Sequence, residues 1–301
     1  MAITPPVWLW AAFTIAASGA QTARNAMQRD LVATLGTRGA TFVRFVYGLP
    51  FALMFLAGLA AALGARPPTP GAAALIWAAT GGVAQILATG LLLATMQARS
   101  FVVATAYTKT EPIQVALFGA LALGEHLGAT SWLAIAIATA GVTLMSWPKD
   151  DPDAPRDWRP AVLGLSSAAL FAVSAIGYRA AIVALGAPSF VIGASTVLAM
   201  TLTLQTTLIL VYLALLDRKL LAALFAAWRP SLGAGFMGAL ASQFWFLAFA
   251  IESAARVRTL ALIEIPFAQV ASRRVFRQST SAREWLGMAL IVAGVAMLLA
   301  M

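Results

Sequence analysis

Residues 132–142, WLAIAIATAGV, and residues 285–295, WLGMALIVAGV, are two copies of one motif placed 153 positions apart. Six positions are identical, and almost all the others exchange one small or apolar residue for another. Chance similarity between two core helices of a soluble protein is one explanation. Each copy, however, closes a half-chain that consists almost wholly of apolar segments of membrane length. The motif therefore indicates an internal duplication.

The composition is that of a membrane protein. Hydrophobic residues make up 61% of the 301 positions and charged residues only 10%, whereas soluble domains carry about 25% charged residues. Within a bilayer every backbone polar group must be bonded internally, so only helices and closed barrels can span it. The apolar runs are long and rich in Leu and Ala, and they lack the alternation of barrel strands. We therefore expect an all-α integral membrane protein.

Ten apolar stretches are long enough to cross a hydrocarbon core about 30 Å thick. Pro148–Asp157 is the only distinctly polar linker, and its prolines and charges exclude it from a span. The prediction is thus a first repeat at residues 1–147, a linker at 148–160 and a second repeat at 161–301. Each repeat has five helices, an odd number, so the second repeat inserts upside down relative to the first. The predicted spans are residues 7–28, 40–63, 72–96, 101–123, 129–147, 161–185, 188–215, 230–251, 258–275 and 284–301.

The duplication extends into the fourth helix of each half. At an offset of 154 positions Pro112 coincides with Pro266. A proline inside a helix removes a backbone hydrogen bond and typically kinks the helix. Two matched kinks would mark the centre of a carrier, and prolines that are merely tolerated by packing are the alternative.

This combination of features resembles the EamA-type members of the drug/metabolite transporter superfamily. The features that carry the resemblance are Glu111-Pro112 and Ile265-Pro266 in the fourth helices and the closing W-L motif of each half. Arg44 and Gly124-Glu125 also fit that pattern, and the likeness is greatest to the ten-helix branch that exports aromatic amino acids and paraquat. The second half departs from the pattern, because Arg277-Gln278-Ser279 replaces the Gly-Glu pair and no arginine matches Arg44.

Several functional classes are disfavoured. The net charge of +9 would suggest nucleic acid binding in a soluble protein, but here most Lys and Arg lie between apolar segments, where they anchor the topology. Cysteine is absent and His126 is the only histidine, so thiolate or histidine metal sites and a histidine proton relay are excluded. No motif of an intramembrane enzyme is present. We expect no catalytic residues, no metal, no cofactor and no nucleic acid partner.

Trp245 is the one tryptophan in the middle of a predicted span, whereas the other eight lie at segment ends, as interfacial tryptophans do. Its indole N–H needs a partner. Gln243, two residues away, is a second polar group. Either both side chains line a cavity or they are satisfied by packing within the bundle.

Lys109 and Glu111 lie in the predicted fourth helix. A charge at the centre of a membrane helix costs about 2.5–3.5 kcal/mol on insertion scales, so both need water, a partner or a substrate. Two residues apart, they point away from each other and cannot pair on one helix. Glu264 in the ninth helix lies almost opposite Glu111 in the repeat. Two interpretations of these charged side chains stay open. They line a cavity, or they form a structural ion pair between helices, such as Lys109 with Glu264.

Weaker candidates for substrate contact accompany these charges. Arginines near span ends usually extend toward lipid headgroups, and glutamines often join helices by hydrogen bonds. Aromatic side chains are compatible with an aromatic or cationic ligand. The candidates of this kind are Arg24, Arg44, Arg179, Gln85, Tyr107 and Tyr178.

Small residues at matched positions predict helix packing. Ala136 and Ala140, and their counterparts Ala289 and Ala293, form small-xxx-small faces. We expect these faces to pack the two halves together; a contact in a homodimer is the alternative.

The leading hypothesis is a polytopic carrier in a bacterial inner membrane that exports a small metabolite by alternating access around a central cavity. The resemblance implies amino acids, aromatic ones favoured, and cationic drugs as a further class. A channel or receptor, or a carrier of another metabolite class, is the alternative. The protein is expected to act as a monomer or a homodimer in the lipid bilayer.

The charge distribution and the family resemblance predict opposite orientations of the chain in the membrane. Loops after odd-numbered helices carry thirteen Lys and Arg, and loops after even-numbered helices carry four at most (Arg66, Arg179, Arg256 and Arg258). The positive-inside rule then places both termini outside the cytoplasm. The family resemblance implies the reverse, and we expect cytoplasmic termini.

Overall fold

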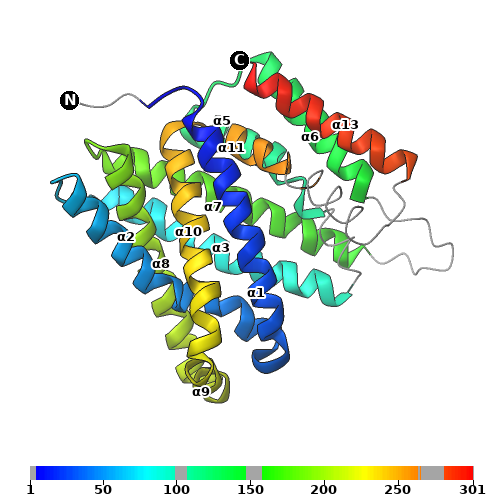
Figure 1. Cartoon of the computed structure of the whole chain (residues 1–301). Coiled ribbons are helices and arrows are strands. Elements are labelled where there is room, and N and C mark those ends of the chain that lie inside the picture. Colours follow the sequence, from blue (N-terminus) through cyan, green and yellow to red (C-terminus); the bar gives the residue numbers. More distant parts are fainter. Residues whose placement is uncertain (1–4, 99–106, 147–157, 264, 266–280, 301) are drawn as a thin grey trace. The chain divides into compact units, whose positions relative to one another are not determined.

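The fold is all-α in a computed structural model of the chain, which describes residues 5–98, 107–146, 158–263, 265 and 281–300. No strand occurs among these residues. The helices, labelled as in Figure 1, are α1 (Leu9–Val46), α2 (Gly48–Ala62), α3 (Ala72–Ala98), α5 (Glu111–Leu123), α6 (Ala129–Ser146), α7 (Arg159–Leu185), α8 (Phe190–Leu216), α9 (Arg218–Ala226), α10 (Trp228–Ile251), α11 (Ala254–Leu260), the 3₁₀ helix η1 (Ala261–Ile263) and α13 (Ala282–Leu299).

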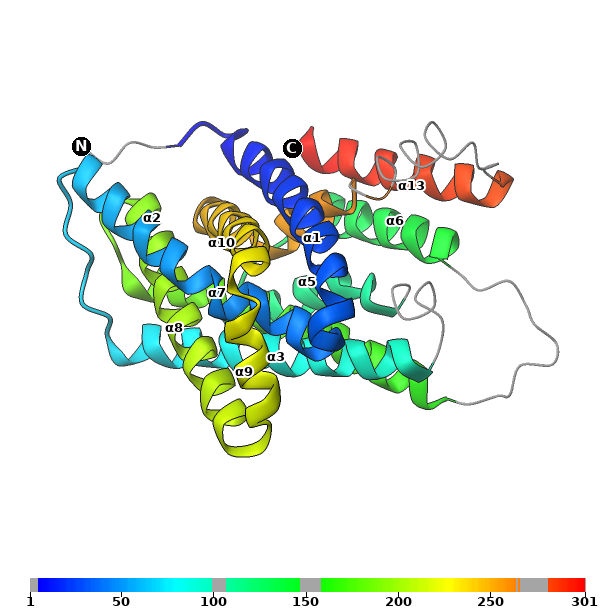
Figure 2. The ribbon, with the colours of Figure 1, turned by 60° about the horizontal axis from the view of Figure 1, so that its bottom comes forward.

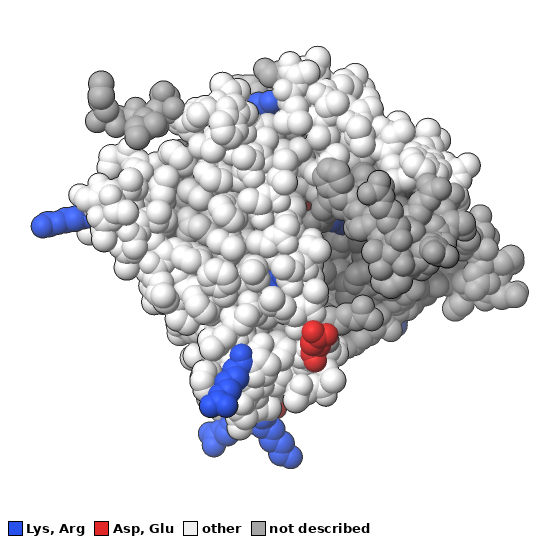
Figure 3. Space-filling view, viewed as in Figure 1, with Lys and Arg blue, Asp and Glu red and all other residues white. Residues whose placement is uncertain are grey.

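Five described segments are long and apolar enough to cross a membrane, and three apolar helices are shorter. On the face shown in Figure 3 the described surface is almost free of charge, and Lys and Arg side chains gather at the end where α9 lies. A surface with so few charged groups fits contact with lipid. The five long segments are Asp30–Ala62, Ala72–Thr95, Arg159–Leu185, Phe190–Leu216 and Trp228–Ile251.

The predicted spans agree with the helices in the middle of the chain and differ at several ends. The expected loop at residues 29–39 is helical and belongs to α1, and residues 218–226, also expected in a loop, form the helix α9. Most of the predicted ninth span lies outside the described residues. The count of ten spans and their inverted arrangement therefore stay predictions.

A single glycine bends α1. Gly36 has φ 64° and ψ 173°, which is the only non-helical backbone within α1 and a conformation that side chains other than glycine rarely adopt. Gln28 Nε2 donates to the carbonyl of Ala40 at 2.6 Å across this bend. The first two predicted spans are therefore joined by a helical bend closed by a hydrogen bond, where a polar loop was expected.

Pro112 was predicted to lie inside a continuous helix and to kink it, but it stands at the start of α5. Lys109 and Thr110 form a turn, and α5 begins at Glu111, so Pro112 stands in the first helical turn. A proline is tolerated there because the amide of the first turn has no partner within the helix. Pro266 lies outside the described residues.

The described chain divides into two compact units that each take segments from both predicted repeats. Unit 1 consists of residues 1–83 and 177–252, and unit 2 consists of residues 84–176 and 253–301. Compact units and sequence repeats are thus different divisions of the chain. The predicted repeat boundaries remain a prediction.

Unit 1 is held together by close contacts between long helices. The most extensive contact is that between α1 and α10, which lie side by side in Figures 1 and 2. α2 packs on both α8 and α10. A Cβ added at Gly235 of α10 would lie 2.5 Å from Cβ of Tyr47, so the absence of a side chain allows these helices to approach. Tyr47 Oη donates to the carbonyl of Leu224 at 2.8 Å.

Unit 2 contains the two copies of the W-L motif, packed against each other as α6 and α13 (Figures 1 and 2). A Cβ added at Gly141 would lie 2.6 Å from the carbonyl oxygen of Gly287, and one added at Gly294 would lie 2.6 Å from that of Ala134. With the offset of 153, Gly294 corresponds to Gly141 and Gly287 to Ala134. The contact is therefore reciprocal, and because residue numbers rise on α6 as they fall on α13, the two helices are antiparallel.

The packing face itself differs from the predicted one. Ala136, Ala140, Ala289 and Ala293 are exposed, whereas Ala134 and Ala138 are fully buried. The prediction that α6 and α13 pack was right, but the small-xxx-small pattern placed their contact on the wrong face. Alanine is frequent all round both helices, so spacing alone could not distinguish the face toward the partner from the face toward lipid.

Substitution of Gly141 by leucine should destabilise the protein. Four added carbons at a backbone-to-backbone contact force α6 and α13 apart, and overpacking typically costs about 1–3 kcal/mol. The melting temperature of the detergent-purified G141L variant, followed by fluorescence-detected size exclusion, should fall clearly below that of wild type. A136L is the matched control on the same helix. Equal melting temperatures for G141L and A136L would contradict this packing.

Candidate functional site

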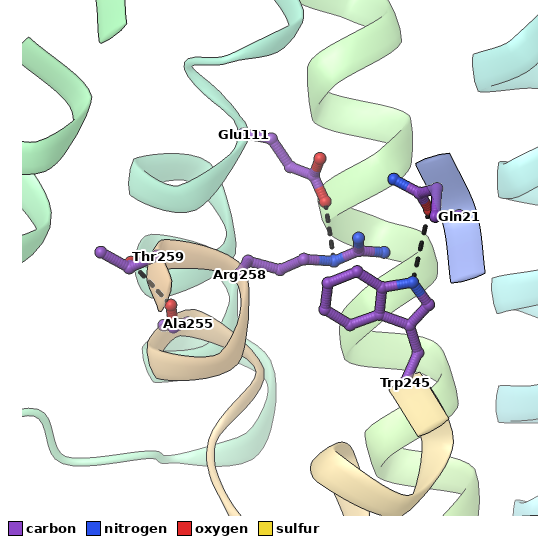
Figure 4. Close-up of polar contacts among 6 residues, drawn as sticks. All are labelled: Gln21, Glu111, Trp245, Ala255, Arg258 and Thr259. Atoms are coloured by element: carbon purple, nitrogen blue, oxygen red, sulfur yellow. Dashed lines mark hydrogen bonds and ion pairs between the residues drawn. The ribbon is translucent and has the colours of Figure 1, made fainter. Parts of the chain in front are cut away.

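The clearest charged pair of unit 2 joins α5 to α11. Arg258 Nε lies 3.2 Å from Glu111 Oε1, and the two side chains are only 16% and 17% exposed (Figure 4). Glu111 stands in the first turn of α5, where a carboxylate is also favoured by the helix dipole. α11 in turn begins at a Ser253 cap, whose Oγ accepts from the amide of Arg256 at 3.4 Å. The pair is sheltered enough to tie the two helices together.

Arg258 was missed as a functional candidate. It was counted among the loop arginines, although it is the first residue of the predicted ninth span. The signal that could have identified it is the requirement of Glu111 for a cation on another helix. The predicted partner of Lys109, Glu264, lies outside the described residues, so that ion pair stays a prediction.

The other predicted residues of unit 2 have distinct environments. Lys109 lies in the turn before α5 and is half-buried. Tyr107 packs on α7, because a Cβ added at Gly164 would lie 2.5 Å from its Cβ. Gln85 is half-buried on α3, and its carbonyl accepts from Thr89 Oγ1 at 2.8 Å.

In unit 1, Trp245 and Gln243 are both buried within α10. Trp245 Nε1 donates to Oε1 of Gln21 on α1 at 3.3 Å (Figure 4). Gln243 Nε2 donates to Oγ of Ser195 on α8 at 2.8 Å, whereas its Oε1 is buried with no hydrogen-bond partner among the described residues. The indole therefore has the partner that its burial requires, and the amide oxygen of Gln243 keeps an acceptor available for a ligand or water.

Tyr178 is a core residue of unit 1. It is 2% exposed, and its ring centroid lies 4.6 Å from that of Phe246. Its hydroxyl accepts from Gln205 Nε2 at 3.3 Å, and the same amide donates to the carbonyl of Gly82 at 3.0 Å. These contacts join α3, α7, α8 and α10, so they support the packing of the helices more directly than substrate contact.

Two arginines of α1 reach α10 in unit 1. A Cβ added at Gly238 would lie 3.2 Å from Cβ of Arg44 and 3.4 Å from Cδ of Arg24. The guanidinium carbon of Arg44 lies 4.3 Å from the ring centroid of Phe45, a cation–π distance. Both arginines were weaker candidates from the sequence, and the structure brings both to Gly238.

No metal site is formed within the part of the chain that the structure describes, since no group of three or more His, Cys, Asp or Glu comes together there. The candidate residues described above carry amides, hydroxyls, a carboxylate, guanidiniums and the ammonium of Lys109. Such groups can bind and orient a polar solute by hydrogen bonds and charge.

Comparison with known proteins gives a family match to part of the chain and a likeness in fold. Residues 7–147 match the model of the EamA-like transporter family. A solved structure described as "Crystal structure of protein" is similar to the chain with a TM-score of 0.66 and 15% sequence identity, over 96% of this chain and 98% of that chain. At this identity the likeness shows a shared fold alone. No curated protein matches the chain. The five long apolar segments fit a multi-pass membrane protein.

A double-mutant cycle should reveal the Glu111–Arg258 pair. Removing one partner of a buried ion pair typically destabilises by about 3–5 kcal/mol because the other charge is left uncompensated. E111A and R258A should each lower the melting temperature, and the E111A/R258A double variant should lose much less than the sum of the two. Additive losses would show that the two side chains are energetically independent.

Proposed function

Because residues 7–147 match the EamA-like transporter family, we propose that the chain is a secondary carrier that exports small metabolites by alternating access. The proposed substrates are amino acids, aromatic ones favoured, with cationic drugs as a second class. This choice follows the resemblance to the aromatic amino-acid and paraquat exporters. The family match is the observation that carries the proposal.

The antiparallel packing of α6 and α13 supports the inverted-repeat part of the proposal. Two copies of one motif that exchange equivalent contacts in opposite directions are what a duplication inserted upside down would produce. Repeats of this kind give a carrier two equivalent gates, of which one is open at a time.

The residues proposed to meet the substrate already have partners of their own. Glu111 is paired with Arg258, and Trp245 donates to Gln21. A ligand that replaces such a partner binds at the expense of an existing contact, so binding and conformational change are coupled. The full set of proposed substrate-contacting residues is Arg44, Gln85, Tyr107, Lys109, Glu111, Tyr178, Gln243, Trp245 and Glu264.

Transport can be tested in liposomes. The purified chain should show saturable counterflow of phenylalanine or tyrosine, because a carrier exchanges substrate without a net gradient, whereas a channel does not. Flux that follows the gradient without saturation or counterflow would contradict the carrier.

Substitution of Lys109 by alanine should abolish this counterflow and leave the melting temperature within about 2 °C of wild type, because a ΔΔG near zero barely moves the transition. This is the result expected if its ammonium serves the substrate. K219A, at an exposed position of α9, is the matched control and should transport normally. Intact counterflow by a stable K109A would remove Lys109 from the proposed site, and a large loss of stability would make its role structural.

For the location we propose a bacterial inner membrane with both termini in the cytoplasm. The resemblance supports this orientation, and the distribution of arginines opposes it. Arg179, Arg256 and Arg258, three of the four basic residues after even helices, hold backbone carbonyls or Glu111. If these arginines are left out of the count, the excess of Lys and Arg in the loops after odd-numbered helices becomes larger.

A fusion to the C-terminus should decide the orientation. With a cytoplasmic terminus, a green fluorescent protein fusion should fluoresce and an alkaline phosphatase fusion should be inactive. An active phosphatase fusion would place the termini outside and favour the charge rule over the resemblance.

A further inference from the structure

The short helix α9 connects two membrane-length segments of unit 1. Phe190–Leu216 ends directly before the cap residue of α9, Asp217, and Trp228–Ile251 begins two residues after its last residue, Ala226. The nine residues of α9 extend over only about 14 Å, whereas the hydrocarbon core of a bilayer is about 30 Å thick. α9 therefore lies where one span ends and the next begins, at the boundary between hydrocarbon and water.

One face of α9 is fixed to the neighbouring helices. Leu224 is fully buried, and Leu220 approaches α1, because a Cβ added at Gly39 would lie 2.9 Å from its Cδ1. Asp217 caps the helix, since its Oδ1 accepts from the amide of Leu220 at 3.1 Å, and its Oδ2 lies 3.6 Å from Nη2 of Arg38. These contacts determine which side of α9 faces away from the helix bundle.

The exposed side chains of α9 and of the residues after it mix cations with large apolar groups. Arg218 is exposed at the first position of α9, Phe225 is 51% exposed, and Trp228 is 48% exposed. The guanidinium carbon of Arg229 lies 5.3 Å from the ring centroid of Trp228, a cation–π distance. Aromatic rings are enriched at the level of lipid headgroups, and basic side chains extend toward the phosphates there. This region therefore has the composition of a headgroup contact.

Basic side chains outnumber acidic ones in this region. Residues 217–229 include three Lys or Arg and one Asp, which gives a net charge of +2. The acidic member is Asp217, whose carboxylate already caps α9 and meets Arg38. Figure 3 shows Lys and Arg side chains gathered at the end where α9 lies, with acidic side chains among them. A surface of this charge is attracted to anionic lipid headgroups.

We propose that the exposed side of α9 together with Trp228 and Arg229, here called the α9 surface, binds the phosphate groups of anionic phospholipids in the surrounding bilayer. Arg218 and Arg229 are separated by the length of α9, so each meets a headgroup of its own. Arg218 is oriented by its Nε, which donates to the carbonyl of Ala214 at 2.9 Å. Phe225, between the two arginines, contacts the first part of the acyl chains. The proposal requires that α8 and α10 span the bilayer, and it does not depend on what the chain transports.

The first test compares lipids that differ in charge. Phosphatidylglycerol added to the detergent-purified full chain should raise its melting temperature, because a ligand that binds the folded state stabilises it. Phosphatidylcholine, which carries a phosphate but no net charge, should raise it much less. An increase in salt from about 0.1 M to 1 M shortens the Debye length from about 10 Å to 3 Å and should remove most of this difference. Equal stabilisation by both lipids, or by inorganic phosphate alone, would overturn the proposal.

The second test removes the two arginines. R218Q/R229Q should raise the concentration of phosphatidylglycerol needed for half-maximal stabilisation roughly 10- to 30-fold, since one basic side chain near an anionic surface contributes about fivefold. R218K/R229K keeps both charges and should retain most of the stabilisation. R66Q, which removes an exposed arginine of the loop between α2 and α3, is the matched control and should behave as wild type. An equal loss in R66Q, or none in R218Q/R229Q, would contradict the α9 surface.

Native mass spectrometry gives a readout that does not depend on stability, in case loss of the contact between Arg218 and Ala214 lowers the melting temperature by itself. From an equimolar mixture of the two lipids, wild type and R66Q should preferentially retain phosphatidylglycerol, and R218Q/R229Q should lose this preference. An unchanged preference in R218Q/R229Q would place lipid binding elsewhere on the chain and reject the proposal. Absence of counterflow together with an intact lipid preference would reject only the proposed carrier.

Discussion

The architecture depends on satisfying the carbonyl groups left open at helix ends in an apolar medium. The last turn of any helix leaves carbonyls without partners, and lipid cannot supply a donor. Here arginines supply it: Arg179 donates to the carbonyls of Phe249 and Glu252 at the end of α10, and Arg256 and Arg283 donate to Leu298 and Leu144 at the ends of α13 and α6. Each guanidinium is favoured there also by the negative end of the helix dipole.

Glycine contacts depend on the same constraint. Between membrane helices there is no hydrophobic driving force, so close backbone approach and good packing must provide the attraction. A Cβ atom added at Gly141, Gly235 or Gly294 would lie within 2.6 Å of a backbone or Cβ atom of the neighbouring segment. Small residues join the helices along their length, and arginines satisfy the carbonyls at their ends.

The sequence predicts helix type and most helix positions, because long apolar runs allow no other structure in a bilayer. It fails at residues 29–39, where polarity suggested a loop and Gly36 instead gives a bend with Gln28 bonded across it. It also places the contact face of α6 wrongly, since Ala136 and Ala138 are identical residues and only the partner helix tells them apart. For the candidate site, burial of Trp245 and Glu111 was foreseeable. Their partners Gln21 and Arg258 were not, because such contacts join residues more than a hundred positions apart.

The reciprocal contact of α6 and α13 has a consequence for synthesis of the chain. Gly141 meets Gly287, and roughly 150 residues separate the two, which at about 5–20 residues per second is a delay on the order of 10–30 s. During that interval α6 lies in the bilayer without α13, and its glycine and alanine face contacts lipid. Because α13 is made after α6, a ribosome that stops between them releases a chain in which this face of α6 is open to any other small-residue helix in the membrane.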